Sequence, residues 1–369
     1  MTGARRRVGI DGRKIPQARE RGPLGTLDHA RELGMDGVFF RTILDISPEL
    51  DDGLLAEVRA HATEHGLYLE AGLGKVNPFA TPETPELRRI GNGDIVAGFT
   101  RMMQACARIG CHELWVGTAN YKACYAGRLA YDRFRTDVTW EEQLTATARF
   151  LHKLAPVARD LGIHLNLETH EEITSFEVIR LVEDVGPDVA GIVFDTGNVL
   201  QRLEHPVWAA RRVAPYTRQT HLKDAALLNG PVGVLYQMRP CGDGVVDFPV
   251  LVPLLLAANP ALNLSLETDE PRPAARPALT MLIETAHPGF RRAHPDVTAD
   301  ELAAWEDLVR SCEARVGRAE LPDHATYGTA PYGYAEAAGY IRRSAEVIRA
   351  AAVRPAPPSP TAPLARRRA

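Results

Sequence analysis

Short apolar runs alternate with longer amphipathic runs along most of the chain. Most of the eight short runs are almost continuously apolar, which is typical of parallel β-strands covered on both faces. The candidate strands are Val8–Asp11, Gly37–Phe40, Leu67–Gly72, Glu113–Gly117, Ile163–Glu168, Gly191–Asp195, Arg218–Lys223 and Leu262–Glu267. Between the strands, apolar residues recur at three- and four-residue spacing, which predicts helices. The candidate helices are Leu54–Glu64, Asp94–Ile109, Trp140–Leu161, Phe176–Val185, Pro206–Val213, Phe248–Ala258 and Tyr334–Val353.

The order of these elements predicts one closed barrel. Several helices are followed by a glycine, at Gly66, Gly110, Gly162 and Gly186, where the left-handed conformation can end a helix. Eight β/α repeats with right-handed crossovers predict a single (β/α)8 TIM barrel over residues 1–353. A doubly wound open sheet is the alternative, but the glycine-rich phosphate-binding sequence that often marks it is missing after the first strand.

Two long segments interrupt the repeat, Ala119–Val138 after the fourth strand and Thr268–Gly333 after the eighth. Both leave from the carboxyl ends of strands, where the loops of a barrel build its active site. We expect the second segment to cover the pocket or to form a subunit contact, and surface decoration is the alternative. Its start, Pro271-Arg272-Pro273, argues against a direct run into helix. The proline-rich tail, residues 354–369, is predicted to be disordered.

Composition and charge exclude several classes of protein. The chain has a net charge of −4 and 7% aromatic residues, which argues against a nucleic-acid-binding protein. No apolar run approaches the length of a membrane span, and the amino terminus lacks the apolar segment of a secretory signal. The five cysteines are odd in number and have no zinc-type spacing. We therefore expect a cytoplasmic, reduced protein without a membrane partner.

Four successive strands end in residues that can bind a metal. Glu168 ends the fifth predicted strand, Asp195 the sixth, His221 lies near the end of the seventh, and Glu267 ends the eighth. Taken singly, each could be an ion-pair partner, a buried histidine or a turn residue. Together, three adjacent carboxylates would repel one another unless a cation compensated them. This oxygen-rich set suits one divalent ion, Mn²⁺, Mg²⁺, Co²⁺ or Zn²⁺.

The same strand ends resemble a known family. The motifs are Leu167-Glu168-Thr169-His170, Phe194-Asp195-Thr196-Gly197-Asn198, His221-Leu222-Lys223-Asp224, Leu266-Glu267 and the glycine-rich run 242–248. They resemble the xylose-isomerase-like barrels, which include sugar isomerases, ketose epimerases and inosose dehydratases. The resemblance implies that Glu168, Asp195, His221 and Glu267 hold the metal, with Mn²⁺ the first expectation. In the epimerases the two glutamates also move protons, so Glu168 and Glu267 are candidate catalytic residues.

The chain departs from the family pattern at Asn198, where many relatives carry a histidine three residues after the aspartate. The change weakens the interpretation as a ketose epimerase, and also that as the related abasic-site endonuclease, which needs more histidines. His170 lies two residues after Glu168, so it would share a strand face with that ligand and could serve as a neutral general base. The alternative is a structural role, in which His170 caps the next loop or pairs with Glu171. The Glu-Thr-His order also looks like the large subunit of bacterial C-glycoside deglycosidases, which eliminate from 3-oxo-C-glycosides and carry a small second subunit.

Other polar residues have two interpretations each. Asn198, Lys223 and Asp224 are predicted to bind substrate, although Lys223 and Asp224 could instead pair with each other. The glycine-rich loop at 242–244 lacks the lysine of a phosphate-binding loop and suits a close backbone approach. Arg13 and Lys14 could face the pocket. An arginine- and tyrosine-rich group could bind an anionic or aromatic ligand or form a solvated loop face; it consists of Tyr125, Arg128, Tyr131, Arg133 and Arg135.

These observations favour a metal-dependent enzyme that deprotonates the carbon next to a carbonyl in a sugar or polyol. Reprotonation would give isomerase or epimerase chemistry, and expulsion of a β-substituent would give a lyase, because the enediolate is common to both. A non-catalytic sugar sensor is the alternative from another class, but none of the metal ligands is missing. We expect a small carbohydrate as the substrate, and either a homo-oligomer or a small second subunit as partner.

Overall fold

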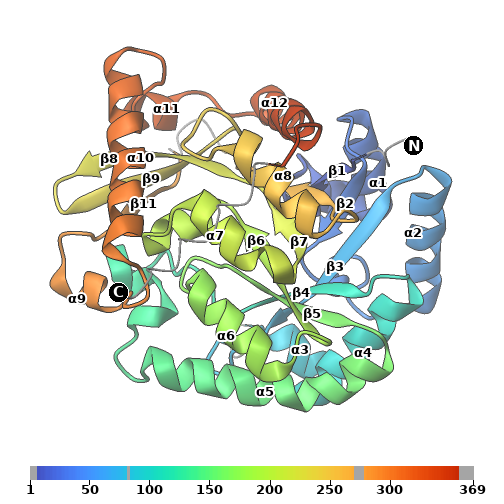
Figure 1. The fold of residues 1–369 in the computed structure, drawn as a ribbon. Coiled ribbons are helices and arrows are strands. Elements are labelled where there is room, and N and C mark those ends of the chain that lie inside the picture. Colours follow the sequence, from blue (N-terminus) through green and yellow to red (C-terminus); the bar gives the residue numbers. More distant parts are fainter. Residues whose placement is uncertain (1–5, 81–83, 270–277, 357–369) are drawn as a thin grey trace, which may run out of the picture.

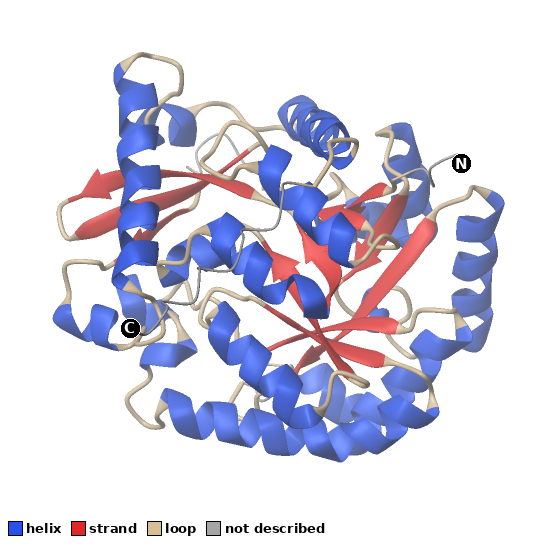
Figure 2. Cartoon of the chain, in the orientation of Figure 1, coloured by secondary structure: helices blue, strands red, loops and turns tan. Residues whose placement is uncertain are grey.

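A computed structural model describes residues 6–80, 84–269 and 278–356. The predicted start of the long insert, Pro271-Arg272-Pro273, and most of the predicted disordered tail lie outside the described residues. Eight parallel strands form the central sheet, and helices surround it (Figures 1 and 2). The strands are β1 (Val8–Asp11), β2 (Gly37–Phe40), β3 (Tyr68–Lys75), β4 (Glu113–Gly117), β5 (His164–Glu168), β6 (Ala190–Asp195), β7 (Thr217–His221) and β10 (Leu264–Leu266).

The sheet closes into a barrel. Its strand order is β10-β1-β2-β3-β4-β5-β6-β7, so every neighbour but one follows the order of the chain. The two ends of this order meet through a parallel bridge between Leu222 and Leu266. Leu222 N donates to Ser265 O at 2.8 Å, and Glu267 N donates to Leu222 O at 3.0 Å. The predicted (β/α)8 barrel is therefore confirmed, and all eight predicted strands are present.

One helix of the outer layer follows each barrel strand. These helices are α1 (Ala18–Glu32), α2 (Asp52–Glu64), α4 (Ile95–Arg108), α5 (Trp140–Asp160), α6 (Ser175–Val185), α7 (Pro206–Val213), α8 (Phe248–Ala258) and α12 (Tyr334–Ala352). Local signals fix several boundaries: Thr139 and Thr174 form capping boxes with Glu142 and Glu177 at the starts of α5 and α6. The pattern of apolar residues did not predict α1, because a glycine with φ 66° and a proline interrupt it at residues 22–23.

A second, antiparallel sheet stands beside the barrel, and the sequence did not predict it. Its strands run in the order β11 (Thr280–Ile283), β9 (Gly233–Arg239) and β8 (Asp224–Gly230). β8 and β9 form a hairpin directly after the seventh barrel strand, and α10 (Ala299–Gly317) packs on β8 (Figure 1). The remaining helices are short: α3 (Pro85–Ile90), α9 (Pro288–Arg292), α11 (His324–Thr329), and the 3₁₀ turns η1 (Gly12–Lys14), η2 (Ile43–Asp45), η4 (Gly127–Ala130), η5 (Asp132–Phe134), η6 (Asn198–Arg202) and η7 (Ala214–Tyr216).

The described part of the long insert, residues 278–333, packs at the carboxyl side of the barrel. Trp305 Nε1 donates to the carbonyl of Leu200, just after β6, at 2.9 Å. The Glu301 carboxylate pairs with Arg212 of α7 at 2.9 Å. The insert thus lies at the end of the barrel where we expected it. Among the described residues, no helix is long and apolar enough to cross a membrane.

Candidate metal centre and active site

Four side chains at the carboxyl ends of adjacent strands meet in one buried cluster. Glu168, Asp195 and His221 are the last residues of β5, β6 and β7, and Glu267 directly follows β10. Each offers a ligand atom, and these atoms all lie within 4.8 Å of one another. All four residues are buried. The barrel therefore brings together the set that the sequence predicted.

Neighbouring groups hold each carboxylate in a fixed orientation. Asp195 Oδ1 accepts from the backbone N–H groups of Gly197 at 2.9 Å and Asn198 at 2.8 Å, which leaves Oδ2 facing the cluster. Trp115 Nε1 donates to Glu168 Oε2 at 2.8 Å. The other oxygen of Glu168, Oε1, lies 2.9 Å from His221 Nδ1.

Two cations partly balance these carboxylates. Lys223 Nζ lies 2.9 Å from Asp195 Oδ2 and 3.1 Å from Glu267 Oε2. Arg41 Nη2 pairs with Glu267 Oε1, while Arg41 Nε lies 2.6 Å from Asp11 Oδ2. Four buried carboxylates thus surround two permanently charged cations. When Asp195 is ionised, as a metal ligand must be, these four carboxylates outnumber the two cations, which favours a further cation at this position.

The pKa values follow from this crowding. Burial raises the pKa of Asp195, and the charges of Glu267 and Glu168 add to the effect, while Lys223 opposes it. Burial alone would also raise the pKa of Glu267, but Arg41, Lys223 and His221 together bring it well below its usual value. Burial would also raise the pKa of Glu168, but the positive charges of His170 and His221 lower it below its usual value. These two glutamates are therefore ionised and available as ligands at neutral pH.

The donor set fits one divalent ion. Ligands at about 2.1 Å from a metal place opposite donor atoms about 4.2 Å apart, close to the spread observed here. Three carboxylates and one imidazole suit Mn²⁺, Mg²⁺, Co²⁺ or Zn²⁺, and the donor set does not distinguish Mn²⁺ from the others. Glu168, Asp195, His221 and Glu267 would hold the ion.

His170 lies next to this cluster and is oriented by a carboxylate. Its Nδ1 lies 2.6 Å from Glu172 Oε2 and 3.3 Å from Glu171 Oε2, and Thr118 donates to the other oxygen of Glu172. Its Nε2 points toward the cluster, 3.9 Å from Glu168 Oε2. His170 therefore lies close to Glu171, the partner considered from the sequence, but Glu172 is nearer. Its Nε2 still faces the metal cluster.

The charges around His170 affect the pKa of its imidazole. Burial would lower its pKa, but the charges of Glu172 and Glu171 raise it to about 9. These charges thus favour the imidazolium form of His170 as long as Glu168 holds no metal. A divalent ion on Glu168 would lower this pKa again, because like charges repel.

The three predicted substrate-binding residues have different surroundings. Lys223 points into the cluster, as described above. Asn198 is buried; its Oδ1 lies 3.4 Å from Gln201 Nε2, and its Nδ2 has no hydrogen-bond partner among the described residues. Asp224 instead anchors a loop: its carboxylate accepts from four backbone N–H groups at 2.9–3.0 Å, those of Ala225, Gly242, Gly244 and Val246. A Cβ on Gly244 would lie 2.1 Å from Asp224 Oδ1, which accounts for the glycine at this position of the loop.

The arginine- and tyrosine-rich group after β4 mostly stabilises its own loop. Arg133 pairs with Glu177 at 2.7 Å and Arg128 with Glu284 at 2.6 Å. Tyr131 donates to Gln201 Oε1 at 2.7 Å. These contacts join the loop to α6, η6 and the insert. Tyr131 and Arg133 are buried in these contacts, so they do not belong to the solvated loop face that was the alternative for this group.

Sequence reasoning missed three residues of the site. Arg41 follows the last residue of β2, so its position at a strand end was a usable signal. Glu172 gave no periodic signal, because it lies in a loop. Tyr236 lies on β9, which the sequence did not predict; it is buried, and its hydroxyl has no partner among the described residues. A Cβ on Gly197 would lie 2.8 Å from that hydroxyl and 2.7 Å from Lys223 Cγ, so Tyr236 lies beside the metal ligands.

Curated relatives match parts of the chain. The Escherichia coli protein YihM, itself uncharacterized, is 30% identical over 124 residues, which are 32% of this chain and 38% of YihM. Inosose dehydratase 1 of Bacillus cereus is 29% identical over 87 residues, which are 23% of this chain and 29% of that protein. These matches thus span well under half the length of each relative.

Solved structures share the fold. D-psicose 3-epimerase of Clostridium cellulolyticum, solved with D-tagatose, has a TM-score of 0.57 at 15% identity, over 93% of this chain and 99% of that one. A xylose isomerase-like barrel protein of Mycobacterium smegmatis, solved with magnesium, has a TM-score of 0.52 at 17% identity, over 76% and 88% of the two chains. At these identities the likeness is one of fold.

A sequence profile of one family covers most of the barrel. It matches residues 27–285, which include all four predicted metal ligands and the glycine-rich loop. The resemblance inferred from the strand ends is therefore confirmed, and it supports the prediction of an enzyme. The chain belongs to the xylose isomerase-like TIM barrel family.

Proposed function

We propose that the protein is a divalent-metal-dependent enzyme that removes a proton from the carbon next to the carbonyl of a sugar or polyol. One observation carries the proposal: the buried cluster of Glu168, Asp195, His221 and Glu267 has the Nε2 of His170 at its side. The side chains of His170 and Glu267 are each 9% exposed, more than those of the other three residues. A substrate would approach the cluster between them.

The metal has a defined part in this chemistry. When bound, a divalent ion supplies the Lewis acidity that makes a proton next to a carbonyl easier to remove. Its four ligands come from four strands, so the site exists only in the folded barrel. We propose Mn²⁺ first, and the magnesium in the Mycobacterium smegmatis structure makes Mg²⁺ the next choice.

His170 is the proposed base. Glu172 Oε2 accepts a hydrogen bond from Nδ1–H of His170, which fixes the imidazole with Nε2 directed at the centre. A carboxylate–imidazole pair of this kind orients the ring and stabilises the positive charge that develops when Nε2 takes a proton. Glu168 and Glu267 would assist. As metal ligands with lowered pKa values, they are weaker bases than His170.

Lys223, Asn198 and Tyr236 are proposed to bind substrate oxygens. The ammonium of Lys223 already lies among the carboxylates, and the amide nitrogen of Asn198 and the hydroxyl of Tyr236 lack partners among the described residues. Buried polar groups without a partner are costly, so a ligand that supplies one is favoured. Asp224 is not included, because the loop uses its carboxylate fully.

Isomerisation or epimerisation is the leading outcome, and elimination is the second candidate. Asn198 cannot transfer a proton near neutral pH, and His170 serves one face of the substrate. One non-ligand base suffices for elimination from a keto-sugar, as in a lyase of the C-glycoside deglycosidase type. The match to an inosose dehydratase supports this second candidate. A non-catalytic sensor would have no need of an oriented base beside the metal ligands.

Deuterium exchange tests the proposal whichever product the enzyme forms. Keto-sugars and 3-oxo-glycosides would be incubated in D₂O with Mn²⁺ and followed by NMR. We expect deuterium at the carbon next to the carbonyl, and loss of this exchange in His170→Asn, with metal still bound. His152→Asn is the matched control, because that histidine is half exposed on α5 and remote from the centre. Normal exchange in His170→Asn would show that His170 is structural and return the role of base to the glutamates.

The setting of the enzyme is also a proposal. All five cysteines are free, and four are buried, which suits a reducing compartment such as the cytoplasm. We propose a single barrel domain that includes the insert. A homo-oligomer or a small second subunit remains the expected partner.

A further inference from the structure

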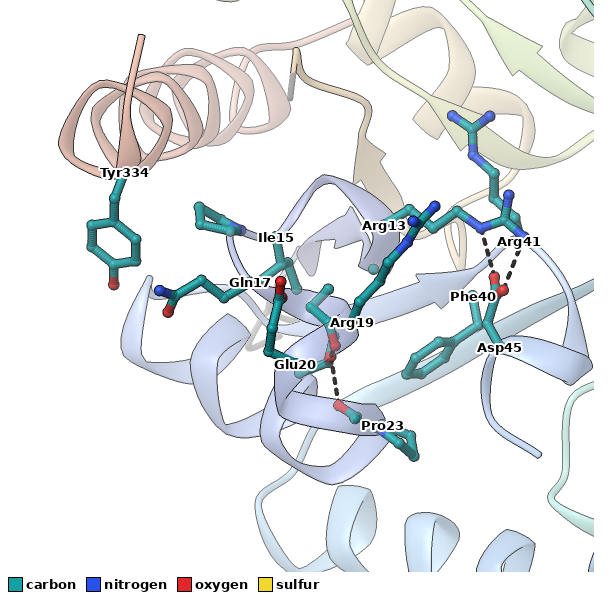
Figure 3. Close-up of a pocket in the computed structure, with 15 residues that line it drawn as sticks. Arg13, Ile15, Gln17, Arg19, Glu20, Pro23, Phe40, Arg41, Asp45 and Tyr334 are labelled. Carbon is teal, nitrogen blue, oxygen red and sulfur yellow. Dashed lines mark hydrogen bonds and ion pairs between the residues drawn. The ribbon is translucent and has the colours of Figure 1, made fainter. Parts of the chain in front are cut away.

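A large cavity lies next to the metal cluster and is not used by the chemistry above. Its volume is about 840 Å³, and it opens at the carboxyl ends of β1 and β2 (Figure 3). Arg41 lines it and also pairs with Glu267, so one side chain separates the cavity from a metal ligand. A ligand in the cavity would therefore lie within reach of the cluster.

The size of the cavity indicates a bulky group. Pockets that enclose a whole drug-sized molecule have about 300–1,000 Å³. The metal cluster itself is buried outside this cavity, and it would hold the reacting carbons. The cavity therefore has room for a second ring in addition to the reacting sugar.

The wall formed by the start of α1 is fixed in shape. Gln17 has a φ of 63°, which is rare for a residue other than glycine, and Gly22 has a φ of 66°. The Thr26 hydroxyl donates to the carbonyl of Gly22 at 2.7 Å and so ties the bend at Pro23 to the next turn. A wall whose shape is supported by the chain's own hydrogen bonds loses less conformational entropy when a ligand binds.

The charges of the cavity argue for an uncharged ligand. Arg13 forms a two-point pair with Asp45, with both distances 2.9 Å, and Arg41 pairs with Asp11 and Glu267. Arg19 is exposed and has no ion-pair partner among the described residues, and Glu20, of opposite charge, lines the same cavity. Two of the three guanidinium groups are thus already engaged by carboxylates of the protein and are not free to bind a phosphate or carboxylate.

Part of the remaining wall is apolar and aromatic, and it lies beside the polar side chains of Gln17, Glu20 and Thr26. Ile15, Pro16, Pro23 and Phe40 line the cavity, and Tyr334 of α12 stands at its edge with 46% of its surface exposed (Figure 3). The Tyr334 ring is held by a 3.0 Å hydrogen bond between its hydroxyl and His29 Nε2. Aromatic and guanidinium planes are surfaces on which another ring can stack.

We propose that this cavity binds an uncharged ring attached to the reacting sugar, so that the substrate is a glycoside rather than a free monosaccharide. The inference rests on the proposed function, since it places the reacting sugar at the metal cluster. It adds the class of substrate.

Two unreactive probes test the cavity. Phenyl and methyl β-D-glucopyranoside differ only in the ring, and their affinities would be measured by saturation-transfer NMR with Mg²⁺ present. We expect the phenyl glucoside to bind about tenfold more tightly, as stacking of one aromatic ring allows. Ala18→Trp, which fills the cavity, should bring the ratio of the phenyl to the methyl glucoside affinity to about one. Tyr334→Ala should reduce this ratio.

Matched controls separate filling of the cavity from general damage. Ala299→Trp changes an exposed alanine that begins α10, and Tyr125→Ala removes a tyrosine that is 56% exposed and does not line the cavity. Neither should change the ratio. A ratio near one in the unaltered protein, or a ratio unchanged by both cavity variants, would overturn the proposal. Tighter binding of glucose 6-phosphate than of either glucoside would overturn it in favour of an anion site.

Failure of this inference and failure of the proposed function give different results. Absence of deuterium exchange with all carbonyl substrates, together with the expected affinity ratio, would refute the proposed chemistry and leave the cavity assigned. Normal deuterium exchange, together with equal affinities for the phenyl and methyl glucosides, would refute the assignment of the cavity and leave the proposed chemistry standing.

Discussion

Replacement of Lys223 by methionine measures how far a metal substitutes for a protein cation. The Lys223 ammonium is buried and contacts Asp195 at 2.9 Å and Glu267 at 3.1 Å. Removal of one partner from a buried ion pair costs about 3–5 kcal/mol. Burial raises the pKa of Asp195 to about 8, so without a metal this carboxyl is largely protonated at pH 7 and depends less on the lysine. We therefore expect the lower value of about 3 kcal/mol at pH 7.

The assay is thermal unfolding with chelator and with excess Mn²⁺. At about 2 cal/mol/K per residue, a loss of about 3 kcal/mol lowers the Tm of a chain of this length by about 4 °C. We expect this loss in chelator. With Mn²⁺ the loss should shrink, because the ion compensates Asp195 and Glu267 in place of the lysine. Lys153→Met, at an exposed position on α5, is the control and should change little.

Two results would refute this reasoning. An equal loss with and without Mn²⁺ would mean that the ion does not contact the two carboxylates. A stable Lys223→Met protein in chelator would mean that the lysine does not compensate them in the absence of metal.

Three further substitutions test other parts of the structure. Glu70→Gln should stabilise the protein by about 3 kcal/mol at pH 8 and change little at pH 4. Burial raises the pKa of Glu70 to about 7, so the stability that the protonated form contributes is lost as the pH rises from about 4.5 through 7. Urea unfolding at several pH values would measure this difference. Tyr236→Phe should leave the Tm unchanged or raised but lower kcat/KM for exchange by about tenfold, since the hydroxyl has no partner among the described residues; an unchanged kcat/KM would contradict the assignment. Gly244→Ala should lower the free energy of unfolding by about 2–3 kcal/mol through its clash with Asp224. Gly339→Ala, where a Cβ meets nothing within 4 Å, should stabilise α12. Equal effects of the two variants in thermal unfolding would contradict the close packing at Gly244.

The barrel could be predicted because each of its elements carries a local signal. β1, β2 and β4 have the predicted boundaries, as do α7 and α8. The kinked helix α1 was missed because glycine and proline interrupt its pattern. The β8–β9 hairpin was missed because it depends on contacts with β11 and α10, which are more than 40 residues away in the chain.

The metal cluster was predictable for a geometric reason. Strand ends in a barrel meet at one mouth, so a residue's place in the chain fixed its place in space. The partners that orient these residues did not follow from the pattern. Trp115 and Glu172 contact the site from β4 and a loop, and only the folded chain shows which oxygen each one engages. The same holds for Asp224, whose carboxylate binds four backbone N–H groups rather than a substrate.

Metal content is the most direct test of the central claim. After dialysis against chelator, incubation with Mn²⁺ and removal of free ion, elemental analysis should find about one equivalent per chain. His221→Ala should lose most of this metal while its circular dichroism spectrum stays that of the folded barrel, and His152→Ala should retain it. An unchanged metal content in folded His221→Ala would contradict the assignment of Glu168, Asp195, His221 and Glu267 as the metal site.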